Sequence, residues 1–398
     1  MNSRKAILKI FRGEDPEQVV WQPRIENWYD VKERQEALPE SYQGLSLLDV
    51  YDKLKCSPRP YVGASLEHAI QPESDQEYGD WQESERVGGG YSPQETPPVF
   101  TNTLEGGGIT YKRKLKGDDL IEVWKTPKGD LTRKWRVTDL SISLQPYGYP
   151  VKQVEHLEVM EYILRHQKVE FHYDNYEFVR NRMGGRAPLA ISAPRAPFQQ
   201  FLLFYMGYEQ GVVALHKHTD AIENFLESAE RIDDRFYEVF KDCPIEVVNF
   251  PDNVDGHFDP PPFMEDYLIP HWQQRTEELH AAGMHIDVHW DGSVKSILRY
   301  THEVGVDGFE VLTPEPQGDV TIDEISQALG DNLILLDGIP ATYFMPGADE
   351  KTLKDTVEKL IKEFAPKLIL GISDEMPANG DIKKVSLVSE MVEGYNSN

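Results

Sequence analysis

The sequence predicts an α/β fold: a (β/α)8 TIM barrel with an N-terminal extension and an inserted antiparallel β excursion. Eight short apolar runs are bounded by polar residues, helix-period segments separate nearly all of the later ones, and no GxGxxG motif follows any run. Strands that alternate with helices are typical of a parallel sheet, and eight of them suggest closure. An open doubly wound sheet is the alternative.

The eight predicted strands are Val19–Pro23, Tyr61–Ala64, Pro188–Ala193, Ile245–Phe250, Met284–His289, Gly308–Leu312, Leu333–Leu336 and Leu368–Ile372. Helices are expected over 219–241 and 350–364, where apolar residues recur at i, i+3, i+4 and i+7. Thr321 and Glu324 have the spacing of a capping box, so a further helix should begin there.

We interpret residues 1–398 as a single barrel domain in which 71–140 form a loop and β-hairpin insertion. Residues 71–108 are rich in Glu, Gly, Pro, Ser and Gln and are expected to form a surface loop. Strand-like runs follow at Ile109–Leu115, Leu120–Lys125 and Leu131–Val137, joined by short polar turns that favour hairpins. Met1 to Arg12 are expected to form a small surface helix.

Net charge and composition exclude several classes of protein. The formal charge of −27 argues against binding to nucleic acid or to an anionic membrane, because phosphate contacts need clustered Lys and Arg. No window approaches 18 uninterrupted apolar residues, so no membrane-spanning helix is expected. The two cysteines, Cys56 and Cys243, suggest neither a disulfide framework nor a thiolate metal site, which fits a cytoplasmic protein.

The run from His285 to Asp291 is the most informative stretch for chemistry. Side chains alternate along a strand, so His285, Asp287, His289 and Asp291 share one face, opposite Ile286, Val288 and Trp290. In a barrel the ionisable face would project into the interior, where unpaired charge is costly. A divalent cation bound by His289 and Asp291 would neutralise it, and an internal hydrogen-bond network is the alternative.

Other predicted strands also end in polar side chains. Glu310, Asp337, Asp374 and Glu375 each end or follow a strand, and a barrel mouth would bring them together with His289. They are therefore candidates for the same site, although a carboxylate after a strand is often only a helix cap.

A stiff aromatic loop follows the strand that ends at Phe250. Asp252 and Asn253 come first, and His257 and Phe258 precede a run of three prolines. Such a loop is a candidate wall for an apolar substrate.

The sequence resembles the uroporphyrinogen decarboxylase superfamily, which includes zinc-dependent, corrinoid-linked methyltransferases. The resemblance covers most of the chain and is carried by 19–24, 263–270, His289-Trp290-Asp291-Gly292, 313–319 and 371–377. It implies a (β/α)8 barrel enzyme. Both branch signatures are altered. The decarboxylase motif with two substrate-binding arginines reads Arg24-Ile25-Glu26-Asn27-Trp28 here, and the methyltransferase zinc motif has carboxylates in place of both thiolates.

The resemblance implies the following roles. Arg24, His289 and Asp291 would be catalytic, and the substrate would contact Trp28, Asp252, Asn253, His257 and Phe258. His289, Asp291 and Glu310, with Asp374 or Glu375, would hold a divalent cation such as zinc. The leading hypothesis is a metal-assisted methyltransferase that demethylates a small methoxylated compound towards a separate corrinoid protein. A metal-independent decarboxylase and a catalytically silent binding barrel are the alternatives, and a homodimer is compatible with each.

Overall fold

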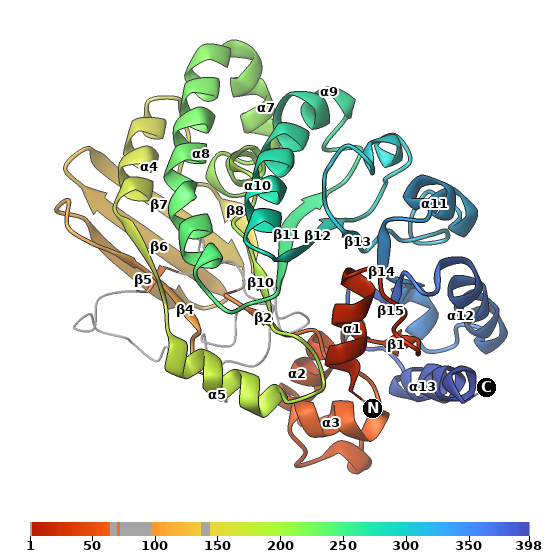
Figure 1. Cartoon of the computed structure of the whole chain (residues 1–398). Coiled ribbons are helices and arrows are strands. Elements are labelled where there is room, and N and C mark those ends of the chain that lie inside the picture. Colours follow the sequence, from red (N-terminus) through yellow and green to blue (C-terminus); the bar gives the residue numbers. More distant parts are fainter. Residues whose placement is uncertain (1, 64–69, 72–96, 137–143, 398) are drawn as a thin grey trace. The chain divides into compact units, whose positions relative to one another are not determined.

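The computed structural model describes residues 2–63, 70–71, 97–136 and 144–397, and the chain divides into two compact units (Figure 1). The first unit comprises Met1–Tyr61, Phe178–Ile191 and Ile245–Asn398, and the second comprises Val62–Glu177 and Ser192–Pro244. Among the described residues, no helix has the length and apolarity needed to cross a bilayer.

An eight-stranded sheet is the framework on which the candidate site is built. Its strand order is β1-β15-β14-β13-β12-β11-β10-β2. The pairs β1–β15, β11–β12, β12–β13, β13–β14 and β14–β15 are parallel. The strands are β1 (Val20–Trp21), β2 (Tyr61–Val62), β10 (Ala190–Ser192), β11 (Val247–Val254), β12 (His285–Trp290), β13 (Gly308–Glu310), β14 (Ile334–Pro340) and β15 (Leu368–Ser373). All eight predicted strands are therefore confirmed, and the fold is α/β with a parallel sheet.

The helices of the first unit alternate with these strands, as the sequence pattern predicts. They are α1 (Ser3–Phe11), α2 (Glu26–Arg34), α3 (Leu47–Leu54), α9 (Pro261–Phe263), α10 (Ile269–Ala281), α11 (Ile322–Leu329), α12 (Glu350–Phe364) and α13 (Ile382–Asn396). Helix α12 has the predicted bounds, and α11 begins at the predicted capping box of Thr321 and Glu324.

The N-terminal helix corrects one prediction. Helix α1 forms where expected, but it is not a surface helix, because Ala6, Ile7, Leu8, Ile10 and Phe11 are buried. Its apolar residues pack against β1 and β15, and the Phe11 ring stacks on the imidazole of His285 at 5.4 Å between centroids. Charged residues around a short apolar group suggested a surface position, but the apolar residues of this nine-residue helix are covered by the sheet.

The second unit contains a mixed three-stranded sheet, a four-stranded antiparallel sheet and its own helices. Its elements are β3 (Ile70–Gln71), β4 (Phe100–Leu104), β5 (Thr110–Lys116), β6 (Asp119–Thr126), β7 (Gly129–Arg136), β8 (Gln145–Gly148), α4 (His156–Arg165), β9 (Gln167–Phe171), α6 (Pro197–Gln200), α7 (Tyr208–Lys217) and α8 (Thr219–Lys241). Helix α5 (Tyr173–Met183) crosses the boundary between the units.

Strands β5 to β8 form a four-stranded sheet in sequence order, with antiparallel pairing throughout. Three of them are the strands predicted at 109–137, and the turns at Gly117 and Gly129 have the positive φ angles that tight hairpins require. Most of the loop predicted at 71–108 lies outside the described residues.

Candidate functional site

The site is a cluster of ionisable side chains at neighbouring strands of the eight-stranded sheet. His289 of β12 lies directly opposite Glu310 of β13, and Asn249 of β11 lies opposite Asp287 of β12. Residues opposite each other in neighbouring strands point to the same face, so the alternation predicted for 285–291 places these groups together. Both pairs are hydrogen-bonded. His289 Nδ1 lies 2.9 Å from Glu310 Oε2, and the Asn249 amide donates to Asp287 Oδ1.

Glu310 is the centre of the cluster. Its Oε1 accepts from Arg59 Nη1 at 2.6 Å, from the Tyr61 hydroxyl at 2.8 Å and from Arg24 Nη1 at 3.4 Å. Its Oε2 accepts from Asn249 at 3.0 Å as well as contacting His289. With five donors and 1 % exposure, this carboxylate is fully desolvated and fully partnered.

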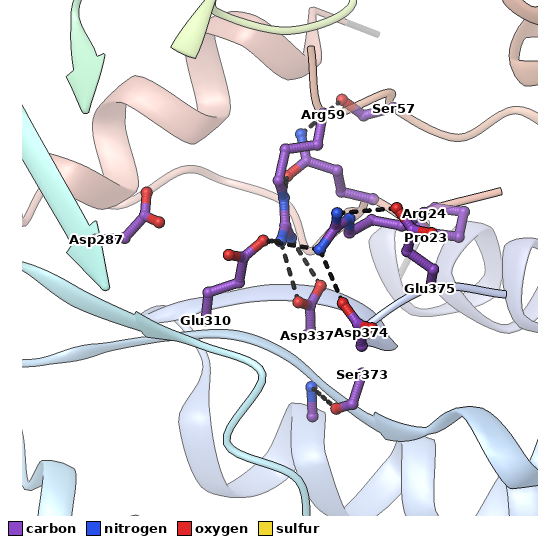
Figure 2. A network of polar contacts seen from close by, with 12 residues as sticks. Pro23, Arg24, Ser57, Arg59, Asp287, Glu310, Asp337, Ser373, Asp374 and Glu375 are labelled. Atoms are coloured by element: carbon purple, nitrogen blue, oxygen red, sulfur yellow. Dashed lines mark hydrogen bonds and ion pairs between the residues drawn. The ribbon is translucent and has the colours of Figure 1, made fainter. Parts of the chain in front are cut away.

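Two arginines supply the counter-charge that buried acids require (Figure 2). Arg59 binds Asp337 with both terminal nitrogens, at 3.0 and 2.7 Å, while contacting Glu310. Arg24 reaches Asp374 at 3.3 Å and Glu375 at 3.0 Å. From the sequence, either a metal ion or an internal hydrogen-bond network is expected to neutralise these groups. In the structure guanidinium groups fill this role, and they come from segments next to β1 and β2.

Close approach of the backbone makes room for Asp337. A Cβ atom on Gly371 of β15 would lie 2.1 Å from Asp337 Oδ1 and 2.9 Å from the Gln22 carbonyl oxygen. Only glycine fits beside that carboxylate. The backbone is also strained at the strand ends, because Val311 and Asp337 have φ angles of 69° and 79°. A β-branched residue rarely adopts such an angle, and strain of this kind gathers at functional sites.

Burial and neighbouring charges shift the pKa values of the ionisable groups in the cluster. Burial opposes charge on His289, but the Glu310 hydrogen bond and charge, aided by Asp374 and Asp291, raise the pKa of His289 to about 9. For Glu310 the positive charges of Arg24, His289 and Arg59 outweigh burial and hold the pKa well below its ordinary value. His289 and Glu310 are therefore an imidazolium–carboxylate pair at neutral pH.

Three other carboxyls bind protons more readily than usual. Burial, with the charge of Glu310 next, raises the pKa of Asp287 to about 8. Burial also raises the pKa of Asp337 to about 6 and that of Glu375 to about 7, although Arg59 and Arg24 respectively oppose it. Among the described residues no arginine is hydrogen-bonded to Asp287, and its pKa is raised to a higher value than those of Asp337 and Glu375.

Two features of the cluster are not filled by its own side chains. His289 is 7 % exposed, and its Nε2 has no hydrogen-bond partner among the described residues. A small cavity of about 20 Å³ is lined by Asp287, Arg59, Tyr61 and Gln22 together with apolar side chains that include Ile7 and Phe11 of α1. That volume admits about one water molecule.

The sequence-predicted residues separate into two groups. Arg24, His289, Glu310, Asp374 and Glu375 lie in one network of contacts. Asp291 follows β12, is mostly buried, and its pKa is raised by burial while His289 opposes the shift.

The expected substrate contacts do not join that network. Trp28 is 1 % exposed and packs edge-to-face on Tyr42, so it belongs to the core around α2. Asp252 is fully buried within β11, which extends further than predicted, and accepts from Trp272 Nε1 of α10 at 2.7 Å. Next to it, Asn253 has a φ angle of 54°. His257 is highly exposed and pairs with Asp255, and Phe258 is 52 % exposed.

The five predicted metal ligands do not form a cation site in this arrangement. Within the described ranges, no three or more His, Cys, Asp or Glu side chains are grouped so that they could hold a metal ion. Glu310, Asp374 and Glu375 direct oxygens at arginines, and His289 Nδ1 is bound to Glu310. A cation with these ligands would have to displace two buried guanidinium groups, so the residues present do not fit it.

Sequence reasoning missed Arg59, Asn249 and Tyr61. Nothing local distinguishes Arg59, which lies between two prolines just before a weak strand. Asn249 could have been noticed, because alternation along its strand places this polar side chain on the inward face. Asp287 and Asp337 were noticed at strand positions, and the structure adds that they share a cluster with Glu310.

Comparison with known proteins identifies the family. The family model described as uroporphyrinogen decarboxylase (URO-D) matches residues 143–395, well over half of the chain. Arg24, Arg59 and Tyr61 precede the matched range. No curated protein matches the chain.

Among solved structures, a methyltransferase from Methanosarcina mazei has a TM-score of 0.58 and 13% identity, and the match covers 98% of each chain. A putative vitamin-B12-independent methionine synthase from Listeria monocytogenes has a TM-score of 0.38 and 15% identity, over 56% of this chain and 68% of that one. A B12-independent methionine synthase from a Shewanella species has a TM-score of 0.40 and 12% identity, over 76% of this chain and 82% of that one. Since the family model spans so much of the chain, this protein belongs to the uroporphyrinogen decarboxylase (URO-D) family.

Proposed function

We propose that this chain is a methyltransferase of the URO-D superfamily that demethylates a small methoxylated compound, with His289 as the general acid. Members of the superfamily are enzymes, and both decarboxylases and methyltransferases occur among them. The observation that carries the proposal is the state of His289. Its Nδ1 is held by Glu310, and its buried Nε2 has no partner among the described residues.

Removal of a methyl group from an ether needs acid assistance. The bond between carbon and oxygen breaks, its electron pair stays on oxygen, and the oxygen must gain a proton to leave as an alcohol. The new bond to carbon uses an electron pair from the acceptor, which the resemblance suggests is a separate corrinoid protein. His289 would give the proton from Nε2, and Glu310 would orient the ring and stabilise its charged form. The raised pKa of His289 keeps it protonated at neutral pH.

The arginines support a substrate with few carboxylates. Arg24 and Arg59 are already bound by four acids, namely Glu310, Asp337, Asp374 and Glu375. A polycarboxylate substrate would have to displace these acids and bring more negative charge into an acidic cluster. A neutral methoxylated molecule avoids that cost. The loop with Asp252, Asn253, His257 and Phe258 stays a predicted substrate contact, and Trp28 is a weaker candidate because it is buried.

Metal-assisted chemistry stays a prediction from the resemblance. A divalent cation such as zinc at His289 and Asp291 would supply Lewis-acid activation. Because the carboxylates of the cluster are occupied by arginines, the proposed mechanism assigns acid assistance to His289 and uses no metal step. The corrinoid partner, the homodimer and the cytoplasmic location likewise remain predictions.

Barrel closure is part of the proposal, as is the interpretation of 1–398 as a single domain with an insertion at 71–140. Closure requires the β1 edge to meet the chain at β2. Two contacts support it: Ser57 N donates to the Trp21 carbonyl at 2.8 Å, and Gln22 Nε2 donates to the Pro58 carbonyl at 2.8 Å. Both contacts lie just before β2, so a closed sheet would place Arg24 and Arg59 at the same mouth as Glu310.

A metal-independent decarboxylase is the second candidate, and Asp287 favours it. A buried carboxyl with a pKa of about 8 can protonate the carbanion that forms when carbon dioxide leaves. This alternative needs Arg24 to exchange a carboxylate partner for substrate, and Asp374, which is half exposed, is the partner most easily replaced.

Assays of the purified full chain separate these functions. Methoxylated aromatic compounds are incubated with chemically reduced cobalamin as the methyl acceptor, and methylcobalamin is followed by its visible absorbance. We expect turnover that His289→Ala lowers by about 10²- to 10⁴-fold. Carbon dioxide release from aromatic acids, without methyl transfer, would establish the decarboxylase instead. Turnover that is unchanged in His289→Ala would remove the proposed acid, and turnover in neither assay would favour a silent binding barrel.

A further inference from the structure

One face of the four-stranded sheet β5–β8 is strongly basic in an otherwise acidic protein (Figure 1, orange to yellow). Residues 109–136 contain nine lysines and arginines against four acidic residues, while the whole chain carries −27. Such asymmetry within one supersecondary unit points to an electrostatic role for that unit.

Strand register shows how the charges are arranged. Ile121 of β6 lies directly between Lys114 of β5 and Lys134 of β7. One row further, Val123 lies between Lys112 and Thr132. Lys125 of β6 and Lys116 of β5 lie on the same face by alternation, and the lysines are exposed while Ile121 and Val123 are half exposed. Asp119 lies opposite Lys116, and Asp130 lies opposite Lys125, so these two acids interrupt the positive rim. The face therefore has a lysine-rich rim around a small apolar centre, and we call it the lysine ring.

The lysine ring has little internal compensation. Arg136 pairs with Asp119 at 2.9 Å, but no acidic partner is found among the described residues for Lys112, Lys114, Lys125 or Lys134. Positive charges without an acidic partner leave this face free to attract a negatively charged one.

The opposite face of the sheet is closed. Glu122, Trp124 and Arg133 are buried there, and Arg133 Nε donates to Glu122 Oε2 at 2.7 Å. Trp135 on the same face packs on Phe204, with ring centroids 5.8 Å apart. Helix α4 also contacts β7. This buried side anchors the sheet within its unit, so the lysine ring is presented on a rigid support.

We propose that the lysine ring is a docking surface for an acidic segment of a partner protein, which places an apolar side chain over Ile121 and Val123. Carboxylates of the segment would meet Lys112, Lys114, Lys125 and Lys134. An apolar centre within a polar rim is the usual organisation of a protein interface. The proposal does not depend on the reaction catalysed at the Glu310 cluster.

Nucleic acid fits the lysine ring less well than protein. Unpaired bases are bound by stacking on exposed aromatic rings, but Tyr111, Trp124 and Trp135 are on the buried side of this sheet. The exposed Tyr147 is already covered by the guanidinium of Arg136 at 5.1 Å. A long polyanion would also extend beyond the patch into the field of an acidic protein.

The test uses the full chain and a fluorescein-labelled peptide of glutamates with interspersed leucines. Anisotropy is measured at about 0.1 M salt, where charges more than roughly 10 Å away are screened and the lysine ring acts locally. We expect saturable binding that a polyglutamate peptide without leucine matches only weakly. The pair Lys114→Glu and Lys134→Glu should weaken binding at least about tenfold, and Lys114→Gln with Lys134→Gln should have a smaller effect in the same direction.

Lys362→Glu, at an exposed lysine of α12 in the first unit, is the matched control and should leave binding unchanged. Circular dichroism checks that each variant is folded, and the glutamine pair keeps the test valid if the glutamate pair is not. Three results would overturn the proposal: no salt-sensitive binding of the peptide, equal loss in Lys362→Glu, or tighter binding of a single-stranded oligonucleotide than of the peptide.

Discussion

Arg59 and Asp337 form a bidentate ion pair inside the protein, with Nη1 3.0 Å from Oδ2 and Nη2 2.7 Å from Oδ1. Arg59 is 7 % exposed and Asp337 is fully buried. The two residues are 278 positions apart in sequence. Their pairing joins the segment before β2 to the β14 strand, and it sets the charge balance around Glu310.

Arg59→Ala should destabilise the fold by about 3–5 kcal/mol, because it leaves Asp337 buried without its main counter-charge and removes one of the three positive partners of Glu310. Urea unfolding followed by tryptophan fluorescence measures the change. Arg186→Ala is the control, since Arg186 makes a bidentate pair with Asp52 at the surface, and it should cost about 1 kcal/mol or less. If the free energy of unfolding falls by similar amounts in the two variants, the buried ion pair contributes no more to stability than the surface pair.

The His289 imidazole should titrate near pH 9, well above the ordinary value for histidine. Proton–carbon correlation spectra of histidine-labelled protein give the titration, and the missing signal in His289→Gln assigns it. In Glu310→Gln the hydrogen bond and charge that raise the pKa are lost while burial remains, so the pKa should fall below about 6.5. An ordinary titration in the native protein would contradict the imidazolium–carboxylate pair.

Asp287 should make the protein less stable as pH rises from about 4 to about 8. Its folded pKa of about 8 exceeds the ordinary unfolded value of about 4, so in this window the folded state binds a proton that the unfolded state lacks. Above the folded pKa the loss is complete. Asp287→Asn keeps a neutral side chain at every pH, so its stability should fall less across this range, by on the order of 5 kcal/mol at about 1.4 kcal/mol per unit of pKa shift.

The comparison for Asp287 is Asp355→Asn, at an exposed carboxylate of α12. That variant should give a stability curve parallel to the native one. The urea midpoint of each protein is measured as a function of pH. If the native protein and Asp287→Asn show the same slope, Asp287 is ionised in the folded state.

Removal of metal should leave the protein folded and its melting temperature unchanged, because Arg24 and Arg59 already neutralise the predicted ligands. Dialysis against a chelator, elemental analysis before and after, and thermal unfolding test this expectation. Stoichiometric zinc that leaves with a fall in melting temperature would show that His289 and Asp291 hold a cation with some of these acids. It would also restore the metal-assisted mechanism.

Local sequence patterns were enough to locate the strands and to predict which side chains share a face. Short apolar runs between polar residues located all eight strands, since burial of both faces of a parallel strand is a local requirement. Alternation along 285–291 then put Asp287 and His289 on one face, because a strand has a period of two. The capping box of Thr321 and Glu324 was readable for the same reason, since its contacts lie within one helical turn.

The partners of these side chains became known only from the tertiary structure. Arg59 meets Glu310 across 251 positions and Arg24 meets it across 286, and no local pattern reports such a contact. The burial of α1 could not be predicted either, because the strands that cover its apolar residues are distant in sequence or were not known to lie beside it. Buried acids need a positive partner, but the sequence leaves a metal ion and a guanidinium group equally acceptable. Tertiary packing selects the guanidinium groups, because the segments after β1 and before β2 bring Arg24 and Arg59 within hydrogen-bonding distance of these acids.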